Sequence, residues 1–590
     1  MMRTHGVPRA TMGTAILLLL ASCGGSDNAG PTPALVIAVS AGDGQSAVVT
    51  SAALLSARVA DGSNTPQSGV SVIWSVVSGG GSITASSLTN AQGVATATFT
   101  LGQIAGQQRA RATASGVGGS PATFTVTAVA GAPARLKKST GDGQTGWAGS
   151  PLPIAYAVTA QDQYNNPVSG VTVTWAVTTG GGALSAPSSI TATSGAATVT
   201  HTLGSTAPAQ TVVATAAAIA GSSVSFTSTS TVGIRLASTV SVPANYGLHD
   251  TFVRDGLAFL CVWDEGVYIY DVGDGRVGGS IDVPKLVGSV KTVNGNAHNA
   301  WWYHSPLGSK RYLFVGEEGA GGVGSSSSGD IHVVDVSNMA APVEVGRYHM
   351  TIAGGTGTAG THNFWVDEVN EILYAAYYNG GVVALDISGT LPADLASREL
   401  ARIQPGGAGN TYVWGVMQYQ GGDIYAADML SGFWRLRYSA GAFSVVGGGN
   451  NVPERYTSDL WVQNGYGYTG GWGNRGTQPG NAVKIWQVGA AAPVLVDSVI
   501  TSGITTVSDV QVSADGKLLV FSAENGPNAG LHIYSLVPSP SQPVFLAKYL
   551  VSQGLHTATV ETIGGRTYVF AARNPANPAL LTFEITSLVP

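Results

Sequence analysis

Short polar pairs recur along the C-terminal part of the chain, and each directly precedes an apolar run typical of a buried β-strand. Successive pairs lie 44 to 64 residues apart, with no helical periodicity between them. Strand-only repeats of this length are typical of β-propeller blades. The seven pairs are His249-Asp250, His298-Asn299, His362-Asn363, Trp414-Gly415, Ser458-Asp459, Ser508-Asp509 and His556-Thr557. The pattern predicts a seven-bladed β-propeller over residues 234–590, with the pairs around one central opening.

The two ends of this predicted propeller complement each other. After the last pair, the chain has apolar runs for only three strands, at 557–563, 567–572 and 580–585. A fourth run is available at the other end, at 234–242. Pairing of 580–585 with 234–242 would remove two exposed sheet edges, so we expect the ring to close in this way.

One strand of each predicted blade carries a recurring motif. Ile331-His332-Val333-Val334-Asp335 recurs as residues 267–271 and 382–386, each ending in aspartate, whereas residues 483–487 and 531–535 have lost that aspartate. The motif resembles the LVIVD-repeat family of bacterial and archaeal surface propellers. An aspartate at a strand end is expected to accept hydrogen bonds from amides of the following turn, which is a structural role.

Two similar segments precede the predicted propeller. Val70, Val72 and Trp74 share one face of a predicted strand, and the segment 68–74 recurs as 169–175. Residues 42–45 likewise recur as 141–144. These motifs resemble bacterial Ig-like domains of the invasin/intimin type. The resemblance implies two β-sandwiches, at 34–133 and 134–233, that act as spacers, with direct ligand binding as the alternative.

The N-terminus has the features of a targeting segment. Arg3 and Arg9 precede an apolar stretch from Met12 to Ala21, which is too short to span a bilayer. Leu20-Ala21-Ser22-Cys23 resembles the lipobox of bacterial lipoproteins. The resemblance implies a signal peptide at 1–23, acylation of Cys23, a flexible tether at 24–33, and lipid anchoring to the cell envelope, at the outer membrane or cell surface. An ordinary secretory signal that contains Cys23 is the alternative.

Composition narrows the functional classes. A chain of 590 residues predicts several domains, and small and β-branched residues with 81 glycines favour an all-β fold. The net charge is only -6 and the sequence after the targeting segment has no run of Lys or Arg, which argues against nucleic-acid binding. Cys261 lies in an apolar run and is expected to be a buried free thiol.

Turns between the second and third strands of the predicted blades are rich in carboxylates and aromatic side chains. These types suit a polar ligand such as a glycan, a peptide or another surface polymer, although they are also common turn formers. The candidate ligand-binding residues are Trp263, Asp264, Glu265, Glu317, Glu318, Tyr377, Tyr378, Asp428, Trp472, Glu524 and Arg573. We therefore expect a funnel at one face of the propeller.

Four of the polar pairs contain histidine, namely those of His249, His298, His362 and His556. They belong to neighbouring predicted blades and could together bind a transition metal, or each could cap its strand through a backbone carbonyl of the next blade. The leading hypothesis is a surface-anchored adhesion or ligand-binding protein that needs no cofactor. The alternative is a metal-dependent oxidoreductase or hydrolase, but no motif identifies a catalytic residue.

Overall fold

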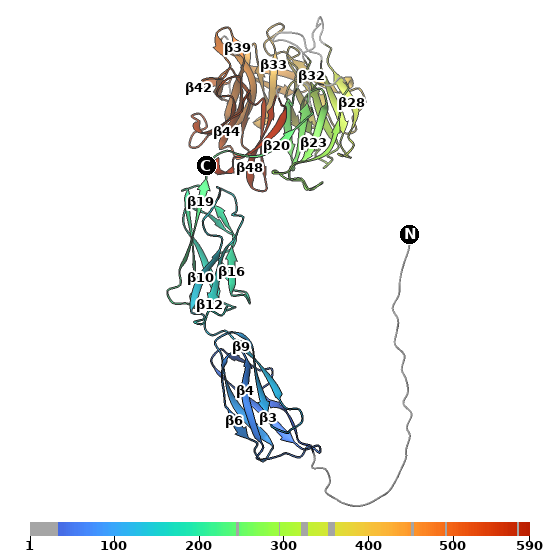
Figure 1. Cartoon of the computed structure of the whole chain (residues 1–590). Helices are drawn as coiled ribbons and strands as arrows, with labels where there is room; N and C mark the ends of the chain where they lie inside the picture. Colours follow the sequence, from blue (N-terminus) through green and yellow to red (C-terminus); the bar gives the residue numbers. More distant parts are fainter. Residues whose placement is uncertain are drawn as a thin grey trace, which may run out of the picture.

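The computed structural model describes residues 34–243, 247–293, 296–319, 329–351, 360–449, 454–489, 492–574 and 577–590. The predicted signal peptide, Cys23 and the tether lie outside these residues. Strands dominate the described chain, and its helical segments are three single turns of 3-10 helix. No helix among the described residues is long and apolar enough to cross a membrane. Figure 1 shows an elongated molecule in which two β-domains in a row carry a larger head.

The first domain consists of two sheets packed face to face. One sheet contains β1 (Val36–Ala41), β3 (Ala52–Ala60), β7 (Val94–Leu101) and β5 (Gly81–Ile83), in that order. The other contains β2 (Ser46–Val48), β9 (Ala122–Val129), β8 (Gly106–Thr113), β4 (Ser71–Ser78) and β6 (Ser86–Leu88). Trp74 of one sheet and Phe99 of the other belong to the same buried core, as the alternation in residues 70–74 predicted.

The second domain repeats this arrangement. One side contains β10 (Arg135–Thr140), β12 (Tyr156–Gln161) and β16 (Ala196–Val199), with the pair β14 (Gly182–Leu184) and β17 (His201–Leu203) beside them. The other contains β11 (Gln144–Trp147), β19 (Val224–Thr231), β18 (Ala209–Thr215), β13 (Thr172–Thr179) and β15 (Ser188–Ile190). Trp175 occupies the core position that Trp74 has in the first domain.

Specific hydrogen bonds connect the successive domains. Asn166 of the second domain donates to the carbonyl of Gln103 at 2.7 Å and accepts from the amide of Ala105 at 2.8 Å. At the other junction, the Ser587 hydroxyl donates to the Gly233 carbonyl at 2.9 Å and accepts from the Gly233 amide at 3.0 Å. Side-chain hydrogen bonds therefore accompany the chain connection at both junctions.

Four-stranded antiparallel sheets make up the first part of the head. They are β21 (Asp250–Arg254), β22 (Leu257–Val262), β23 (Gly266–Asp271) and β24 (Lys285–Val290); β25 (Ala297–Trp302), β26 (Tyr312–Glu317), β27 (Asp330–Asp335) and β28 (Val343–His349); β29 (Phe364–Asp367), β30 (Ile372–Ala376), β31 (Val382–Asp386) and β32 (Glu399–Ile403); and β33 (Val413–Tyr419), β34 (Asp423–Asp428), β35 (Gly432–Ser439) and β36 (Ala442–Gly448). Cys261, in β22, is a buried free thiol as predicted. The turns η1 (Ala396–Arg398) and η2 (Gln420–Gly422) lie between strands.

Two further groups of four strands follow and are joined by the bridges Gly471–Val507 and Gly480–Thr506. They are β37 (Tyr456–Gln463), β38 (Tyr466–Trp472), β41 (Ala482–Gln487) and β42 (Val494–Ile500); and β43 (Thr506–Val512), β44 (Leu518–Glu524), β45 (Gly530–Ser535) and β46 (Val544–Leu550). A short ribbon of β39 (Asn474–Arg475) and β40 (Gln478–Pro479) lies after β38.

The last sheet joins the two ends of the head. It contains β47 (Thr557–Ile563), β48 (Arg566–Arg573), β49 (Ala579–Glu584) and β20 (Arg235–Ser241), and the turn η3 (Thr586–Leu588) follows it. β20 runs antiparallel to β49, with Leu236 opposite Phe583, so the predicted pairing of the ends is confirmed. Arg235 also forms an ion pair with Glu584, at 2.6 Å.

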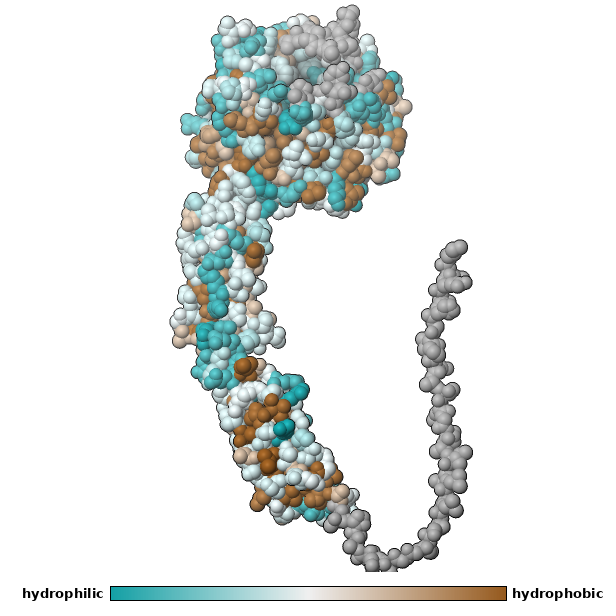
Figure 2. Space-filling view, viewed as in Figure 1, coloured by the Kyte–Doolittle hydropathy of each residue, from teal (hydrophilic) through white to brown (hydrophobic). Residues whose placement is uncertain are grey.

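The first strands of these sheets form a closed circle. β21, β25, β29, β33, β37, β43 and β47 each contact the next, and β47 contacts β21. Sheets that radiate from such a circle have the arrangement of a β-propeller. Figure 2 shows apolar residues distributed over the flank of the head and over the first domain.

Aspartates at the ends of the third strands bind the turns that follow, as expected. Asp271 accepts amide hydrogen bonds from Gly273, Gly275, Val277 and Gly279, all at 2.9 to 3.0 Å. Burial opposes the charge of this carboxylate, but the amides outweigh that effect and lower its pKa to about 2. The aspartate is therefore structural.

Candidate functional site

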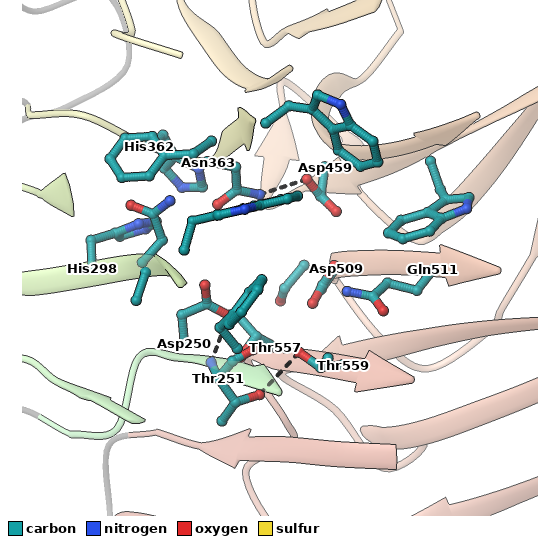
Figure 3. Close-up of a pocket in the computed structure, with 18 of the residues that line it drawn as sticks. Asp250, Thr251, His298, His362, Asn363, Asp459, Asp509, Gln511, Thr557 and Thr559 are labelled. Atoms are coloured by element: carbon teal, nitrogen blue, oxygen red, sulfur yellow. Dashed lines mark hydrogen bonds between the residues drawn. The ribbon is translucent and has the colours of Figure 1, made fainter. Parts of the chain in front are cut away.

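A cavity of about 260 Å³ occupies the centre of the circle of first strands. All seven predicted polar pairs contribute at least one side chain to its lining. Figure 3 shows side chains from the different strands pointing toward this common space. The prediction that the pairs meet around one opening is confirmed.

Irregular strand pairing places both members of a polar pair in the cavity. The amide of His249 donates to the carbonyl of Cys261 at 2.8 Å, and Asp250 is paired with the same Cys261. Two residues of the first strand therefore face one residue of the second, which is a β-bulge. The register also shifts at the pairs of β25, β33, β37 and β43. A bulge re-aims side chains that would otherwise alternate, so neighbouring residues can face the same way.

Four histidines form an arc at one end of the cavity. This imidazole arc consists of His556, His249, His298 and His362, in that order. Neighbouring ring centroids lie 4.0 to 4.1 Å apart, and none of the residues is more than 8% exposed. Trp414 and Trp472 complete the circle, at 4.0 Å from His362 and 5.9 Å from His556 respectively, and 4.7 Å from each other.

Two carboxylates hold part of the imidazole arc. Glu524 Oε1 lies 2.6 Å from Nδ1 of His556, and the Ser508 hydroxyl donates to the same oxygen. Glu318 Oε2 lies 3.7 Å from Nε2 of His249 and 3.6 Å from Nε2 of His298. One carboxylate therefore orients an imidazole directly, and the other lies between two imidazoles.

Polar atoms of the arc are left without partners. Among the described residues, neither ring nitrogen of His298 or His362 forms a well-aligned hydrogen bond, and Nδ1 of His249 also lacks one. These nitrogens are buried, and buried polar atoms are usually satisfied. The backbone of Trp414, in the next sheet, does lie close enough to His362 to oppose the fall of its pKa, which is the contact that the strand-capping alternative predicts.

Burial controls the protonation of the arc. It lowers the pKa of the three imidazoles other than His556 well below the usual value, and neighbouring imidazoles lower it further. Burial also opposes the charge of His556, but the Glu524 carboxylate outweighs it, so the pKa of His556 is raised. Most of the arc is therefore neutral at pH 7 and has lone pairs available.

Carboxyl groups form the next layer of the cavity. Burial raises the pKa of Asp250 to about 7, with a further contribution from Asp509. Burial and the contact between the two carboxyl groups raise the pKa of Asp459 well above its usual range, and burial raises that of Asp509, so the pair shares a proton. Asn363 Nδ2 donates to Asp459 at 2.7 Å (Figure 3). This layer of the cavity therefore consists of carboxyl groups whose pKa values are raised, together with the side-chain amide of Asn363.

Gly415 makes room for this layer. A Cβ at position 415 would lie 2.9 Å from Oδ1 of Asp459, closer than side chains ordinarily approach. The second member of the pair Trp414-Gly415 is a glycine, unlike that of the other six pairs. The Asp459 carboxyl group occupies the space that a side chain at position 415 would need.

Aromatic side chains form the other end of the cavity. Phe252, Trp301, Trp365 and Trp461 line it, with ring centroids 5.2, 5.4 and 6.3 Å apart in succession. All four are partly exposed, and Trp365 also lines a groove on the surface. The cavity therefore opens at this aromatic arc. The sequence analysis missed these residues, although each follows the first member of its polar pair by three positions.

Five of the predicted funnel residues surround the imidazole arc. Trp263 stacks on His249 with centroids 4.8 Å apart, and the Tyr378 hydroxyl donates to Glu318. Trp472, Glu318 and Glu524 contact the arc as described above. They are buried or half-buried and lie outside the lining of the cavity.

The remaining predicted funnel residues are not gathered around the arc. Asp264 and Glu265 lie half-buried in the turn between β22 and β23. Tyr377 packs against Tyr348 with centroids 6.1 Å apart, and Asp428 accepts hydrogen bonds from turn amides. Arg573 donates to the carbonyl of Asn577 at 2.8 Å. Glu317 is buried against His332.

His332 lies buried between two carboxylates. Its ring nitrogens lie 3.3 Å from Glu317 Oε2 and 2.8 Å from Glu344 Oε1. Burial opposes the charge, but the two carboxylates outweigh it and raise the pKa above 6.5. Protonation therefore stabilises the folded head. This stabilisation is complete below pH 6.5, the unfolded pKa, and is lost as the pH rises through the higher folded pKa.

We expect the difference in Tm between the wild type and H332Q to shrink by about 2 °C or more between pH 6 and pH 9. Thermal unfolding of the full chain at a series of pH values measures it. H532Q is the matched control, because His532 is also buried in the head but its pKa is lowered by burial, so its Tm difference should not shrink as the pH rises. A difference for H332Q that stays constant with pH would contradict a charged His332.

No protein-family model matches the chain, and no curated protein matches it. Among solved structures, it is similar to the WD40 β-propeller domain of Doa1, with 10% identity, 60% of this chain and 97% of that chain covered, and a TM-score of 0.41. It is also similar to the β-propeller domain of Myceliophteria thermophila Cps50 (Swd1), with 12% identity, 59% and 99% coverage, and a TM-score of 0.41. The D0-D1 domain of intimin matches at 26% identity over 32% of this chain and 93% of that one, with a TM-score of 0.15.

The head is a β-propeller. Its own circle of first strands and the pairing of its two ends establish that architecture. The similar structures carry no information about ligands or chemistry at this identity. Function must therefore be argued from the cavity.

Proposed function

We propose that this protein is a cell-surface-anchored binding protein. In this proposal Cys23 carries the lipid anchor in the cell envelope, and two bacterial Ig-like domains form the stalk. A seven-bladed LVIVD-type propeller is the ligand-binding head. The elongated shape of the molecule supports the proposal, because the head and the first domain (β4 and β6 in Figure 1) lie at opposite ends of it.

The cavity is the observation that carries the proposal. It has an aromatic arc at its open end and carboxyl and amide groups inside. Aromatic faces stack on the apolar faces of sugar rings, and carboxyl and amide groups accept and donate hydrogen bonds to hydroxyls. A cavity of about 260 Å³ has room for one small group, such as a terminal sugar of a glycan or one side chain of a peptide.

The alternative is a metal-dependent oxidoreductase or hydrolase. Such an enzyme would use the same cavity with an ion at the imidazole arc. If the protein were such an enzyme, it would convert a bound glycan or peptide to product, whereas a binding protein would release it unchanged.

Binding can be tested with the full chain on an array of oligosaccharides and peptides. We expect the double substitution W365A/W461A to weaken binding of the array hits about tenfold or more, because two stacking faces are lost. W434A is the matched control, since Trp434 is also partly exposed but lies outside the cavity. Unchanged binding by the double variant, or an equal loss with W434A, would contradict a ligand site in the cavity.

A further inference from the structure

The imidazole arc contains buried ring nitrogens that form no well-aligned hydrogen bond within the described protein. His298 and His362 are only 1% and 3% exposed, and their four ring nitrogens form no well-aligned hydrogen bond with the described residues. Burying such atoms without partners costs free energy. A bound ligand that accepts several imidazole lone pairs would remove this cost.

The spacing of the donor atoms suits a single metal ion. One ring nitrogen of His249, one of His298 and one oxygen of Glu318 all lie within 4.8 Å of one another. The two nitrogen–oxygen distances are 3.7 and 3.6 Å. Atoms bound to one ion at about 2.1 Å lie roughly 3.0 to 3.5 Å apart, so a contraction of a few tenths of an ångström would suffice.

Hydrogen bonds from the surroundings hold the ligand groups of the arc in place. Glu524 binds Nδ1 of His556, which leaves Nε2 of that imidazole as its metal-binding atom. Metal-bound histidines commonly donate their other N–H to a carboxylate in this way. The Tyr378 hydroxyl donates to Glu318 and holds that carboxylate beside His249 and His298.

A second group of possible ligands nearby lacks these features. Glu317, Asp330 and His332 also lie within 4.8 Å of one another. Both nitrogens of His332 are already engaged by carboxylates, and His349 and Arg347 pair with Asp330. No imidazole lone pair is free there, so that group is a buried ion-pair network.

We propose that the imidazole arc binds one divalent first-row transition-metal ion at His249, His298 and Glu318, whose donor atoms already converge, with His362 and His556 as the further ligands. These two imidazoles lie outside the converging group but next to it in the arc, so they would move toward the ion when it binds. Imidazole-rich sites select such ions over Mg²⁺ and Ca²⁺, which prefer oxygen. The arc lines the inner end of the cavity, so the bound ion faces the space where a ligand would enter. The proposal does not depend on the ligand-binding function.

Metal binding by the full chain can be measured directly, using an affinity tag that contains no histidine. After EDTA treatment, incubation with ZnCl₂ and gel filtration, we expect about one equivalent of zinc by elemental analysis. H298A/H362A should lose this zinc, whereas H304A should keep it, because His304 lies outside the arc. E524Q should weaken zinc binding about 10- to 100-fold in a competition titration, which a merely structural glutamate would not do.

A spectroscopic measurement on the wild type keeps the test independent of how the variants fold. Loaded with one equivalent of Cu²⁺, the wild type should give an electron paramagnetic resonance spectrum with hyperfine splitting from several imidazole nitrogens. Zinc retention below about 0.2 equivalents, or a copper spectrum without nitrogen splitting, would overturn the proposal. So would a folded H298A/H362A variant that retains a full equivalent.

Discussion

Deletion of residues 579–590 is expected to abolish the cooperative unfolding transition of the head while the transitions of the stalk domains remain. β49 lies between β48 and β20, so its removal leaves β20 without a partner and exposes one edge of β48, which then pairs only with β47. Leu580, Leu581 and Phe583 are at most 4% exposed, and truncating one such side chain costs about 2 to 5 kcal/mol. Losing the whole strand should exceed the roughly 5 to 15 kcal/mol that stabilise a typical domain.

Differential scanning calorimetry of the full and shortened chains measures this effect. F583A tests it more finely, with an expected loss of about 3 to 5 kcal/mol. V343A is its control, because Val343 lies on an outer strand and is 58% exposed, and it should change stability by less than about 0.5 kcal/mol. A head transition with an unchanged midpoint in the shortened chain would show that closure by β20 and β49 does not hold the propeller together.

The tryptophan of each stalk domain is expected to have an equally large effect within its own domain. Trp74 is 3% exposed, packs on Phe124 with centroids 5.6 Å apart, and donates to the Ser87 hydroxyl at 2.9 Å. W74A should destabilise the first domain by about 3 to 5 kcal/mol. For a domain of this size, that corresponds to a fall in Tm of roughly 15 to 30 °C.

W175A should produce a similar loss in the second domain. Trp175 is also 3% exposed and donates to the Ser189 hydroxyl at 2.9 Å. I73A is the control, because Ile73 precedes Trp74 in the same strand but faces solvent, at 58% exposure. Calorimetry of the full chain should show each tryptophan variant shifting one stalk transition without moving that of the head. If I73A were as destabilising as W74A, the assignment of the buried face would be wrong.

Much of the architecture could be predicted because its signals are local. Alternation in residues 70–74 identified the buried face of β4, and the same pattern in residues 171–175 identified its counterpart β13. Apolar runs at both ends of the head predicted the pairing of β20 with β49. Strand periodicity requires only neighbouring residues, so sequence alone contains it.

The composition of the cavity could be predicted only in part. Regular alternation places residues i and i+2 on one face, but the bulges bring residues i, i+1 and i+3 into the cavity, as His249, Asp250 and Phe252 show. The aromatic arc was therefore missed. Conversely, adjacent residues in a strand point to opposite faces, which places Glu317 against His332 and Glu318 beside the imidazole arc.

The sequence by itself determined that the chain is built of strands, which face of each stalk strand is buried, and that seven polar pairs meet at one centre. Only the tertiary structure decided that four imidazoles lie in an arc with neighbours about 4 Å apart, which carboxylates hold them, and where the cavity opens. The reason is physical. Hydrophobic periodicity depends on residues close together in the chain, whereas the site depends on bulges and on side chains hundreds of positions apart that ring closure brings together.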